Sequence, residues 1–159
     1  MKLPFRLVNV FAIEGEPFSG NPLCVVLEAA SMPETEMQSW ARQFNLSETT
    51  FVTAVDLRSP AAAARIFTPA HEMPFAGHPT LGTAYVVVDG LQARSGEHLS
   101  EVTLHLPAGP TRVSRDGSRW VLQASGATVR EVEASEAQLA EALGLPVEAL
   151  VPAGAQWVD

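Results

Sequence analysis

The chain has 159 residues, of which 47% are hydrophobic and 18% are charged, and its formal net charge is -8. A chain of this length fits one domain or two small ones and would bury roughly 70% of its unfolded surface. The hydrophobic and charged fractions are those of a globular protein rather than a disordered one. Lys2 is the only lysine and the nine arginines are scattered singly, so the sequence offers no basic stripe to nucleic acid or to an anionic membrane surface.

The N-terminus and the cysteine content indicate the compartment of the protein and exclude some kinds of metal and disulfide site. The first eleven residues lack the apolar core of a signal peptide, and no apolar run approaches the length of a membrane span. Cys24 is the only cysteine, which excludes a disulfide framework and a four-cysteine metal site. These features predict a cytoplasmic globular protein.

Alternating and β-branched patterns predict strands in the first part of the chain, and one amphipathic segment predicts a helix. Ser31 and Glu34 have the spacing of a capping box at the start of that helix. The predicted elements, in chain order, are a strand over residues 5–11, a strand over 23–27, a helix over 32–44, a strand over 49–55 and a strand over 63–67.

The segment that follows is the most informative one in the chain. Pro79 is suited to the first turn of a helix, and residues 81–88 are apolar on nearly every side, as in a helix enclosed by its own domain. Asp89-Gly90 predicts the end of this helix. The unpaired N–H groups at its start make an anion site plausible at Gly77 and His78. The β-branched residues near its end favour a strand instead.

The remaining sequence predicts smaller elements. Residues 91–100 are polar and predict a loop, and the alternation of residues 102–106 predicts a half-buried strand. Residues 111–123 have the pattern of a hairpin, with its turn at Asp116-Gly117. A short helix follows the capping-box residues Ser135 and Gln138 and ends at Gly144, and residues 155–159 resemble the beginning of a strand.

Two residues have the chemistry of catalytic groups. Glu48 lies at a helix-to-strand junction beside Ser47, where hydroxyl and N–H groups can hold a carboxylate, although a glutamate there is more often a surface or capping residue. His78 lies at the start of the buried helix, where it is either a functional group or a hydrogen-bonding loop residue. Spacing alone leaves both alternatives open.

Other candidates favour structural roles. His71 and Glu72 lie near His78, but the spacing differs from that of a zinc-binding helix and Pro74 would break such a helix, so no metal site is predicted. Cys24 lies within an apolar strand and is interpreted as a small core residue. Asn21, between Gly20 and Pro22, is interpreted as a turn residue with a smaller chance of facing a ligand.

Three stretches, residues 18–26, 45–52 and 65–82, closely resemble the phenazine biosynthesis PhzF-like isomerase family in sequence, order and interval. The resemblance implies an α+β, diaminopimelate epimerase-like fold, in which a curved mixed β-sheet wraps around a central apolar helix. Family members have two such domains with the active site between them. We therefore expect residues 1–125 to form the N-terminal domain and residues 126–159 to lead into a second one.

The resemblance also implies roles for individual residues. Glu48 corresponds to the catalytic acid/base of the family, Ser47 to its neighbour in the substrate site, and Gly77 and His78 to residues that line the cleft. In the family the second domain adds an aspartate and a Gly-Ser loop. The implied activity is a cofactor-independent isomerisation, by proton abstraction and return, of a small carboxylate-bearing metabolite.

Two alternatives to this enzyme remain. One is a non-catalytic or partner-dependent half of such an enzyme, acting as a homodimer or with a complementing second-domain chain. The other is a thiol-based epimerase, in which a cysteine precedes the glycine of the site. That position is Ala76 here and Cys24 lies elsewhere, so thiol chemistry is disfavoured.

Overall fold

The structure is a computed structural model that describes every residue except 1, 57, 125, 127, 151–155 and 159. The contacts within the chain divide it into two units, Met1–Gln123 and Ala124–Asp159, and each is described by itself.

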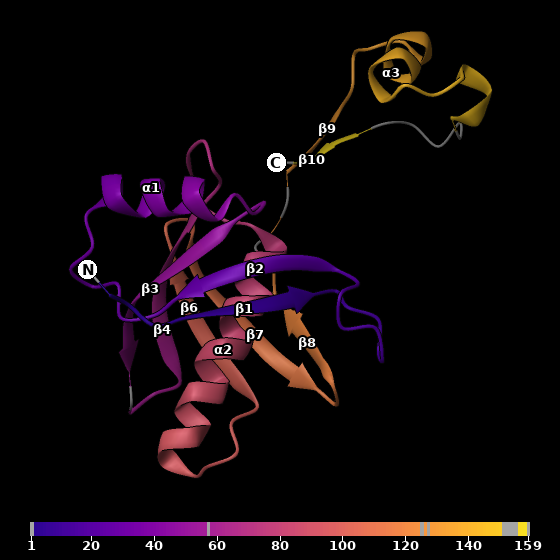
Figure 1. Cartoon of the computed structure of the whole chain (residues 1–159). Helices are drawn as coiled ribbons and strands as arrows, with labels where there is room; N and C mark the ends of the chain where they lie inside the picture. Colours follow the sequence, from indigo (N-terminus) through magenta and orange to yellow (C-terminus); the bar gives the residue numbers. More distant parts are fainter. Residues whose placement is uncertain (1, 57, 125, 127, 151–155, 159) are drawn as a thin grey trace. The chain divides into compact units, whose positions relative to one another are not determined.

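One mixed sheet forms the framework of the first unit (Figure 1). Its strands follow one another in the spatial order β1 (Phe5–Val10), β2 (Asn21–Val26), β3 (Thr49–Asp56), β4 (Ala61–Phe67), β6 (Glu101–Leu106), β7 (Gly109–Asp116) and β8 (Arg119–Leu122). A two-residue strand, β5 (Glu72–Met73), pairs with β4 outside this path. Neighbouring strands are antiparallel except for the parallel pairs β2/β3 and β4/β6. The predicted strands and the hairpin are confirmed, with bounds that differ by at most two residues.

Each parallel pair is joined by a crossover that contains a helix, as parallel pairing requires. Helix α1 (Glu34–Phe44) joins β2 to β3, and helix α2 (Gly77–Ser95) lies between β5 and β6. The capping box predicted at Ser31 is wrong, because the N-cap is Pro33, in an extended conformation without a side-chain cap. A proline disfavours helical backbone angles at the residue before it, so Pro33 opposes a helix that begins at Met32.

The sheet curls around α2, whose side chains form the larger hydrophobic core with the concave face (Figure 1). A second core lies between α1 and the opposite face, around Met37, Phe51 and Phe67. One buried polar contact joins helix and sheet, since the Thr83 hydroxyl donates to Thr50 Oγ1 at 2.9 Å. The expected curved mixed sheet around a central apolar helix is therefore confirmed.

Helix α2 is longer than predicted at both ends. It begins at Gly77 rather than at Pro79, and it continues through the stop predicted at Asp89-Gly90 as far as Ser95. Leu91, which was assigned to a polar loop, is buried against the main core, and its burial outweighs the low helix propensity of Gly90. The helix ends at Gly96, which has a left-handed backbone with φ of 72°.

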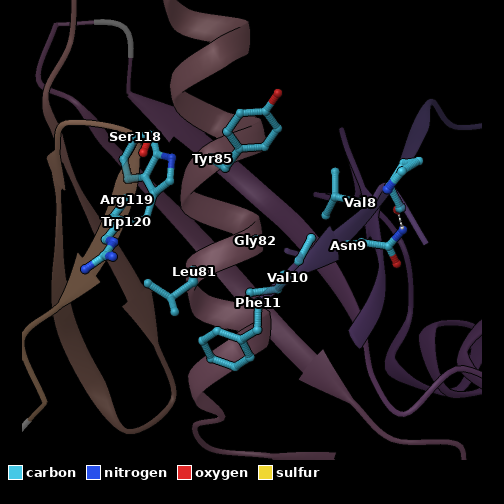
Figure 2. A pocket seen from close by; sticks show the side chains of 12 residues that line it. Val8, Asn9, Val10, Phe11, Leu81, Gly82, Tyr85, Ser118, Arg119 and Trp120 are labelled. Carbon is cyan, nitrogen blue, oxygen red and sulfur yellow. Dashed lines mark hydrogen bonds between the residues drawn. The ribbon is translucent and has the colours of Figure 1, made fainter. Parts of the chain in front are cut away.

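One face of α2 is not enclosed, contrary to the prediction from its apolar sequence. The edge strands β1 and β8 both contact α2 and leave an open groove of about 710 Å³ between them (Figure 2). Leu81 and Tyr85 lie in this groove, and the Tyr85 ring meets the Trp120 ring edge to face at a centroid distance of 6.5 Å. Tyr85 is 43% exposed because the sheet does not close over this side of the helix.

The second unit contains a two-stranded sheet and a short helix. Strand β9 (Val129–Glu131) pairs antiparallel with β10 (Gln156–Val158), so the strand expected near residues 155–159 is confirmed over its described part, while 155 and 159 lie outside the described residues. Helix α3 (Glu136–Leu143) has the predicted capping box between Ser135 and Gln138 and ends at Gly144. A single 3₁₀ turn, η1 (Val147–Ala149), follows it.

Two glycines of α2 offer a matched test of helix-to-sheet packing. A methyl group at Gly82 would lie 2.6 Å from Leu23 Cδ2 and 2.9 Å from Val10 Cγ2, whereas one at Gly90 would meet nothing within 4 Å. We expect Gly82→Ala to lower the free energy of unfolding by about 1 kcal/mol or more, because overpacking outweighs the gain in helix propensity. Gly90→Ala should raise it by up to about 1 kcal/mol. Urea denaturation measures both changes, and a stabilised Gly82→Ala variant would contradict the packing.

Candidate active site

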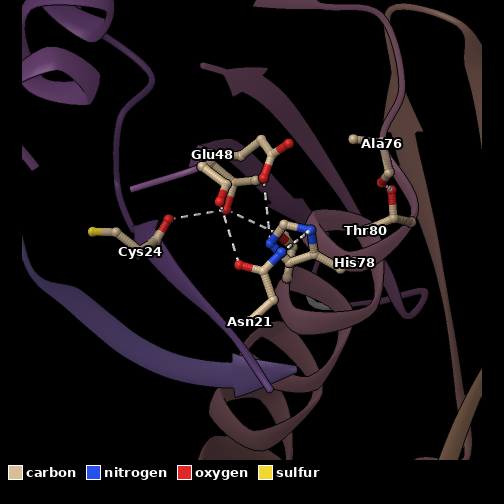
Figure 3. Close-up of polar contacts among 9 residues, drawn as sticks. Asn21, Cys24, Glu48, Ala76, His78 and Thr80 are labelled. Atoms are coloured by element: carbon tan, nitrogen blue, oxygen red, sulfur yellow. Dashed lines mark hydrogen bonds and ion pairs between the residues drawn. The ribbon is translucent and has the colours of Figure 1, made fainter. Parts of the chain in front are cut away.

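The sheet topology brings together three segments that are distant in the sequence (Figure 3). Strands β2 and β3 are parallel, with Cys24 opposite Thr49, so the N-terminal ends of both strands lie at the same edge of the sheet. Asn21 is the first residue of β2, and Glu48 comes directly before β3. The N-terminal turn of α2 brings His78 to this edge.

Glu48 and His78 form a close and largely buried pair. Glu48 Oε2 lies 3.4 Å from His78 Nε2, and the two side chains are 16% and 9% exposed. Within the described part of the chain, neither of these two atoms makes a hydrogen bond. Buried polar atoms are nearly always hydrogen-bonded, so an unpartnered carboxylate oxygen beside an unpartnered ring nitrogen needs an explanation. One explanation is that both atoms are left free to bind a ligand.

The opposite side of the histidine ring faces Asn21. Asn21 Nδ2 lies 3.4 Å from His78 Nδ1, and the hydroxyl of Ser47 donates to Asn21 Oδ1 at 3.4 Å (Figure 3). Ser47 is exposed, so the chain of contacts runs from the surface to the buried ring. Asn21 was interpreted mainly as a turn residue. Its place beside His78 depends on the parallel pairing of β2 with β3, which no local sequence pattern reveals.

Burial determines the charge of the histidine. Removal of the ring from water lowers the pKa of His78 below its ordinary value of 6.5, and the neighbouring carboxylate of Glu48 opposes this shift only in part. The ring is therefore uncharged at neutral pH and carries a single proton. A neutral imidazole donates a hydrogen bond from one nitrogen and accepts one at the other.

The start of α2 has free backbone donors close to this pair. The N-cap is Ala76, which provides no side-chain cap, while the Thr80 hydroxyl and the Thr80 N–H both donate to its carbonyl oxygen. The first N–H groups of a helix have no partner within it, and they favour negative charge. A side chain at Gly77 would meet no atom within 4 Å, so there is open space beside this end of the helix.

Thiol chemistry does not fit the structure. The Cys24 side chain is fully buried, its sulfur points away from His78, and burial raises the pKa of the thiol to about 12 (Figure 3). The interpretation of Cys24 as a core residue is confirmed. Ala76, just before Gly77, supplies no thiol either.

His71 and Glu72 have other partners. His71 Nδ1 lies 3.4 Å from the Thr68 hydroxyl, and Glu72 forms an ion pair with Arg65. Among the described residues, no cluster of three or more His, Cys, Asp or Glu side chains is arranged to hold a metal ion. A search of the same residues for a helix long and apolar enough to cross a membrane finds none.

Comparison with known proteins shows which class of protein has this fold. A solved structure of a predicted epimerase from Pseudomonas aeruginosa matches 99% of this chain and 56% of its own, with a TM-score of 0.79 and 30% identity. The fold is thus that of an enzyme class that isomerises small molecules. The model of the phenazine biosynthesis-like proteins, PhzC-PhzF, matches residues 8–154, and the chain belongs to this family.

Several curated relatives are named as isomerases. The chain is 44% identical to an uncharacterized isomerase of Mesorhizobium japonicum, over 73% of this chain and 38% of the relative. It is 47% identical to the trans-2,3-dihydro-3-hydroxyanthranilate isomerase of Pseudomonas aeruginosa, over 50% of this chain and 28% of that enzyme. The matched part thus spans about a third of each relative.

The charge state of His78 can be tested directly. We expect an NMR titration to give His78 a pKa below 6.5 and Glu48→Gln to lower it further, because the substitution removes the negative charge that favours the protonated ring. Glu97→Gln, on an exposed loop, is the matched control and should leave the His78 titration unchanged. A wild-type pKa above 6.5 would contradict the burial argument.

Proposed function

We propose that this chain carries the acid/base half of a cofactor-independent isomerase that removes a proton from carbon and returns it elsewhere on a small carboxylate-bearing metabolite. The observation that carries the proposal is the buried Glu48–His78 pair, with unpartnered atoms beside an uncapped helix start. Glu48 acts as base and then as acid. Ser47, Gly77 and His78 bind and orient the substrate.

The chemistry follows from these groups. A carboxylate held near a C–H bond can accept its proton and later donate it to another carbon of the same molecule. Negative charge then develops on an oxygen conjugated with the reacting carbon. The N–H groups at the start of α2 and a neutral His78 are donors suited to that charge, and partial burial strengthens their interaction with it. Every step uses protein groups alone.

The names of the relatives suggest a first substrate to test. Trans-2,3-dihydro-3-hydroxyanthranilate, on which the Pseudomonas aeruginosa relative acts by name, combines a carboxylate with carbon-bound protons that can be moved. The carboxylate suits the helix start, and the ring carbons suit the Glu48 base. We therefore choose this compound as the probe.

The site is proposed to be completed by further protein. The matched solved chain is longer than this one, which covers 56% of it. We take residues 1–125 as the first domain and residues 126–159 as the approach to a second, which would close the cleft over Glu48. A second copy of the chain or a complementing second-domain chain can play the same part. The buried single thiol of Cys24 suits a reducing cytoplasm.

A partner-dependent, non-catalytic half is the second candidate. The open groove between β1 and β8 favours it, as do the exposed apolar side chains of Leu7, Phe11 and Phe18. Such surfaces are typical of protein contacts. In this case the role of the chain is to bind its partner, and Glu48 has no catalytic part.

Light scattering tests the association that both candidates require. We expect the chain, with its subunit mass of 17.0 kDa, to form a stable dimer or a one-to-one complex with the second half of the Mesorhizobium japonicum isomerase. The physical reason is that association would cover apolar surface that is now exposed. A monomer that aggregates and binds nothing would contradict this expectation.

Substitution of Glu48 tests the chemistry. In a chimera in which this chain replaces the matched part of the Mesorhizobium japonicum isomerase, we expect Glu48→Gln to slow deuterium exchange from solvent into the probe by about 10²-fold or more, because an amide cannot accept the proton. The circular dichroism spectrum should remain that of the parent.

Two further samples complete this experiment. Glu97→Gln, the same change on an exposed loop, should exchange at the parent rate. Alkylation of thiols in a chimera whose other cysteines have been replaced should also leave the rate unchanged, because Cys24 is buried away from the site. Full exchange by Glu48→Gln would refute the role of Glu48 as base.

A further inference from the structure

We propose that Asn21 is a positioning residue that holds His78 in the tautomer with its proton on Nε2. The inference rests on the proposed function, in which His78 donates a hydrogen bond toward the reacting molecule. Nothing in the local sequence assigns this role to Asn21, which follows instead from the groups that face the two nitrogens of the ring.

The nitrogen Nε2 of His78 faces the carboxylate of Glu48, which can only accept a hydrogen bond. Nε2 lies 3.4 Å from Glu48 Oε2, and a carboxylate accepts hydrogen bonds but donates none. A bare Nε2 would set two acceptors against each other in a pocket where His78 is 9% exposed. The favourable arrangement therefore has the proton on Nε2.

The group that faces Nδ1 can supply the matching donor. A neutral ring with its proton on Nε2 leaves Nδ1 as an acceptor, and Asn21 Nδ2 lies 3.4 Å from it. The amide of Asn21 is oriented in turn by Ser47, whose hydroxyl donates to Asn21 Oδ1 at 3.4 Å. The donors then point in one direction, from Ser47 to Asn21 and from Asn21 to His78. The proton on Nε2 faces the Glu48 carboxylate at 3.4 Å without a hydrogen bond between the two, so it remains free to bind a ligand.

The backbone conformation at residue 21 does not require an asparagine. Asn21 is paired with Val10 in the antiparallel β1/β2 ladder, so its backbone is extended rather than folded in a turn. Many residue types adopt this conformation. An amide side chain, by contrast, is needed to donate to Nδ1 while it accepts from the Ser47 hydroxyl.

Asn21→Asp tests the donor role of the Asn21 amide most directly, because it keeps the shape of the side chain and removes the donor. An aspartate at residue 21 would be an acceptor facing Nδ1, so we expect the proton to move to Nδ1 or the ring to become doubly protonated. With a carboxylate on each side, the pKa of His78 should rise by about 1 or more. Asn21→Leu, which offers neither donor nor acceptor, should remove the tautomer preference without that rise.

The readout is the pattern of long-range proton–nitrogen correlations of the imidazole in the ¹⁵N-labelled chain, which differs between the two tautomers. The His78 signals are assigned by their loss in His78→Gln. Asn9→Asp is the matched control, since Asn9 lies on β1 and its amide donates to the Pro17 carbonyl at 2.7 Å. It should leave the tautomer and the pKa of His78 unchanged.

The expected result is a proton on Nε2 in the wild type, its displacement in Asn21→Asp, and no change in the control. A wild-type proton on Nδ1 would overturn the proposal. So would an unchanged tautomer and pKa in a folded Asn21→Asp variant, as judged by its backbone amide spectrum.

The same variants separate this inference from the proposed function. In the chimera, we expect Asn21→Asp to slow exchange into the probe by about tenfold, the effect of one misdirected hydrogen bond. Full exchange by Glu48→Gln combined with the expected tautomer shift would refute the proposed base and leave the role of Asn21 standing. Full exchange by Asn21→Asp despite a displaced proton would show that the tautomer does not matter for the reaction.

Discussion

The close packing of α2 against β1 and β2 is the constraint on which the rest of the structure depends. At Gly82 the helix approaches the sheet so closely that Leu23 and Val10 occupy the space of a side chain. This contact seats the helix inside the curled sheet, and the Thr83 to Thr50 hydrogen bond fixes its position along the sheet axis. The helix start, with His78 in its first turn, is thereby held at the edge where β2 and β3 begin.

Strand direction accounts for the composition of the candidate site. Two parallel neighbours have their N-terminal ends at the same edge of the sheet. Asn21 is the first residue of β2, Glu48 comes directly before β3, and His78 lies in the first turn of α2. Each of these residues is tied to a regular element, which favours a defined geometry for the hydrogen bonds that select one tautomer.

Local sequence patterns predict much of the fold but only part of the candidate site. Alternation predicted the strands because each half-buried strand presents one face to a core. The end of α2 was predicted too early, because burial of Leu91 outweighs the helix-breaking tendency of Gly90. Glu48 and His78 were candidates from their chemistry and local position, but their roles came from resemblance to a family, since nothing in their spacing indicates a contact. Asn21 was underrated because its proximity to His78 arises from pairing between distant strands.

The hydrogen bond between the Thr50 and Thr83 side chains also bears on which parts of the chain tolerate variation. Both side chains are buried, so sliding the helix by one turn, about 5.4 Å, would break this hydrogen bond and carry His78 away from Glu48. The position of the helix start is therefore fixed by contacts in the first two turns of α2, at Gly82 and Thr83. Insertions or deletions near Gly96 can change the length of the connection to β6 without moving the acid–histidine pair. Changes of length at that end of α2 are thus separated from the chemistry at the other end.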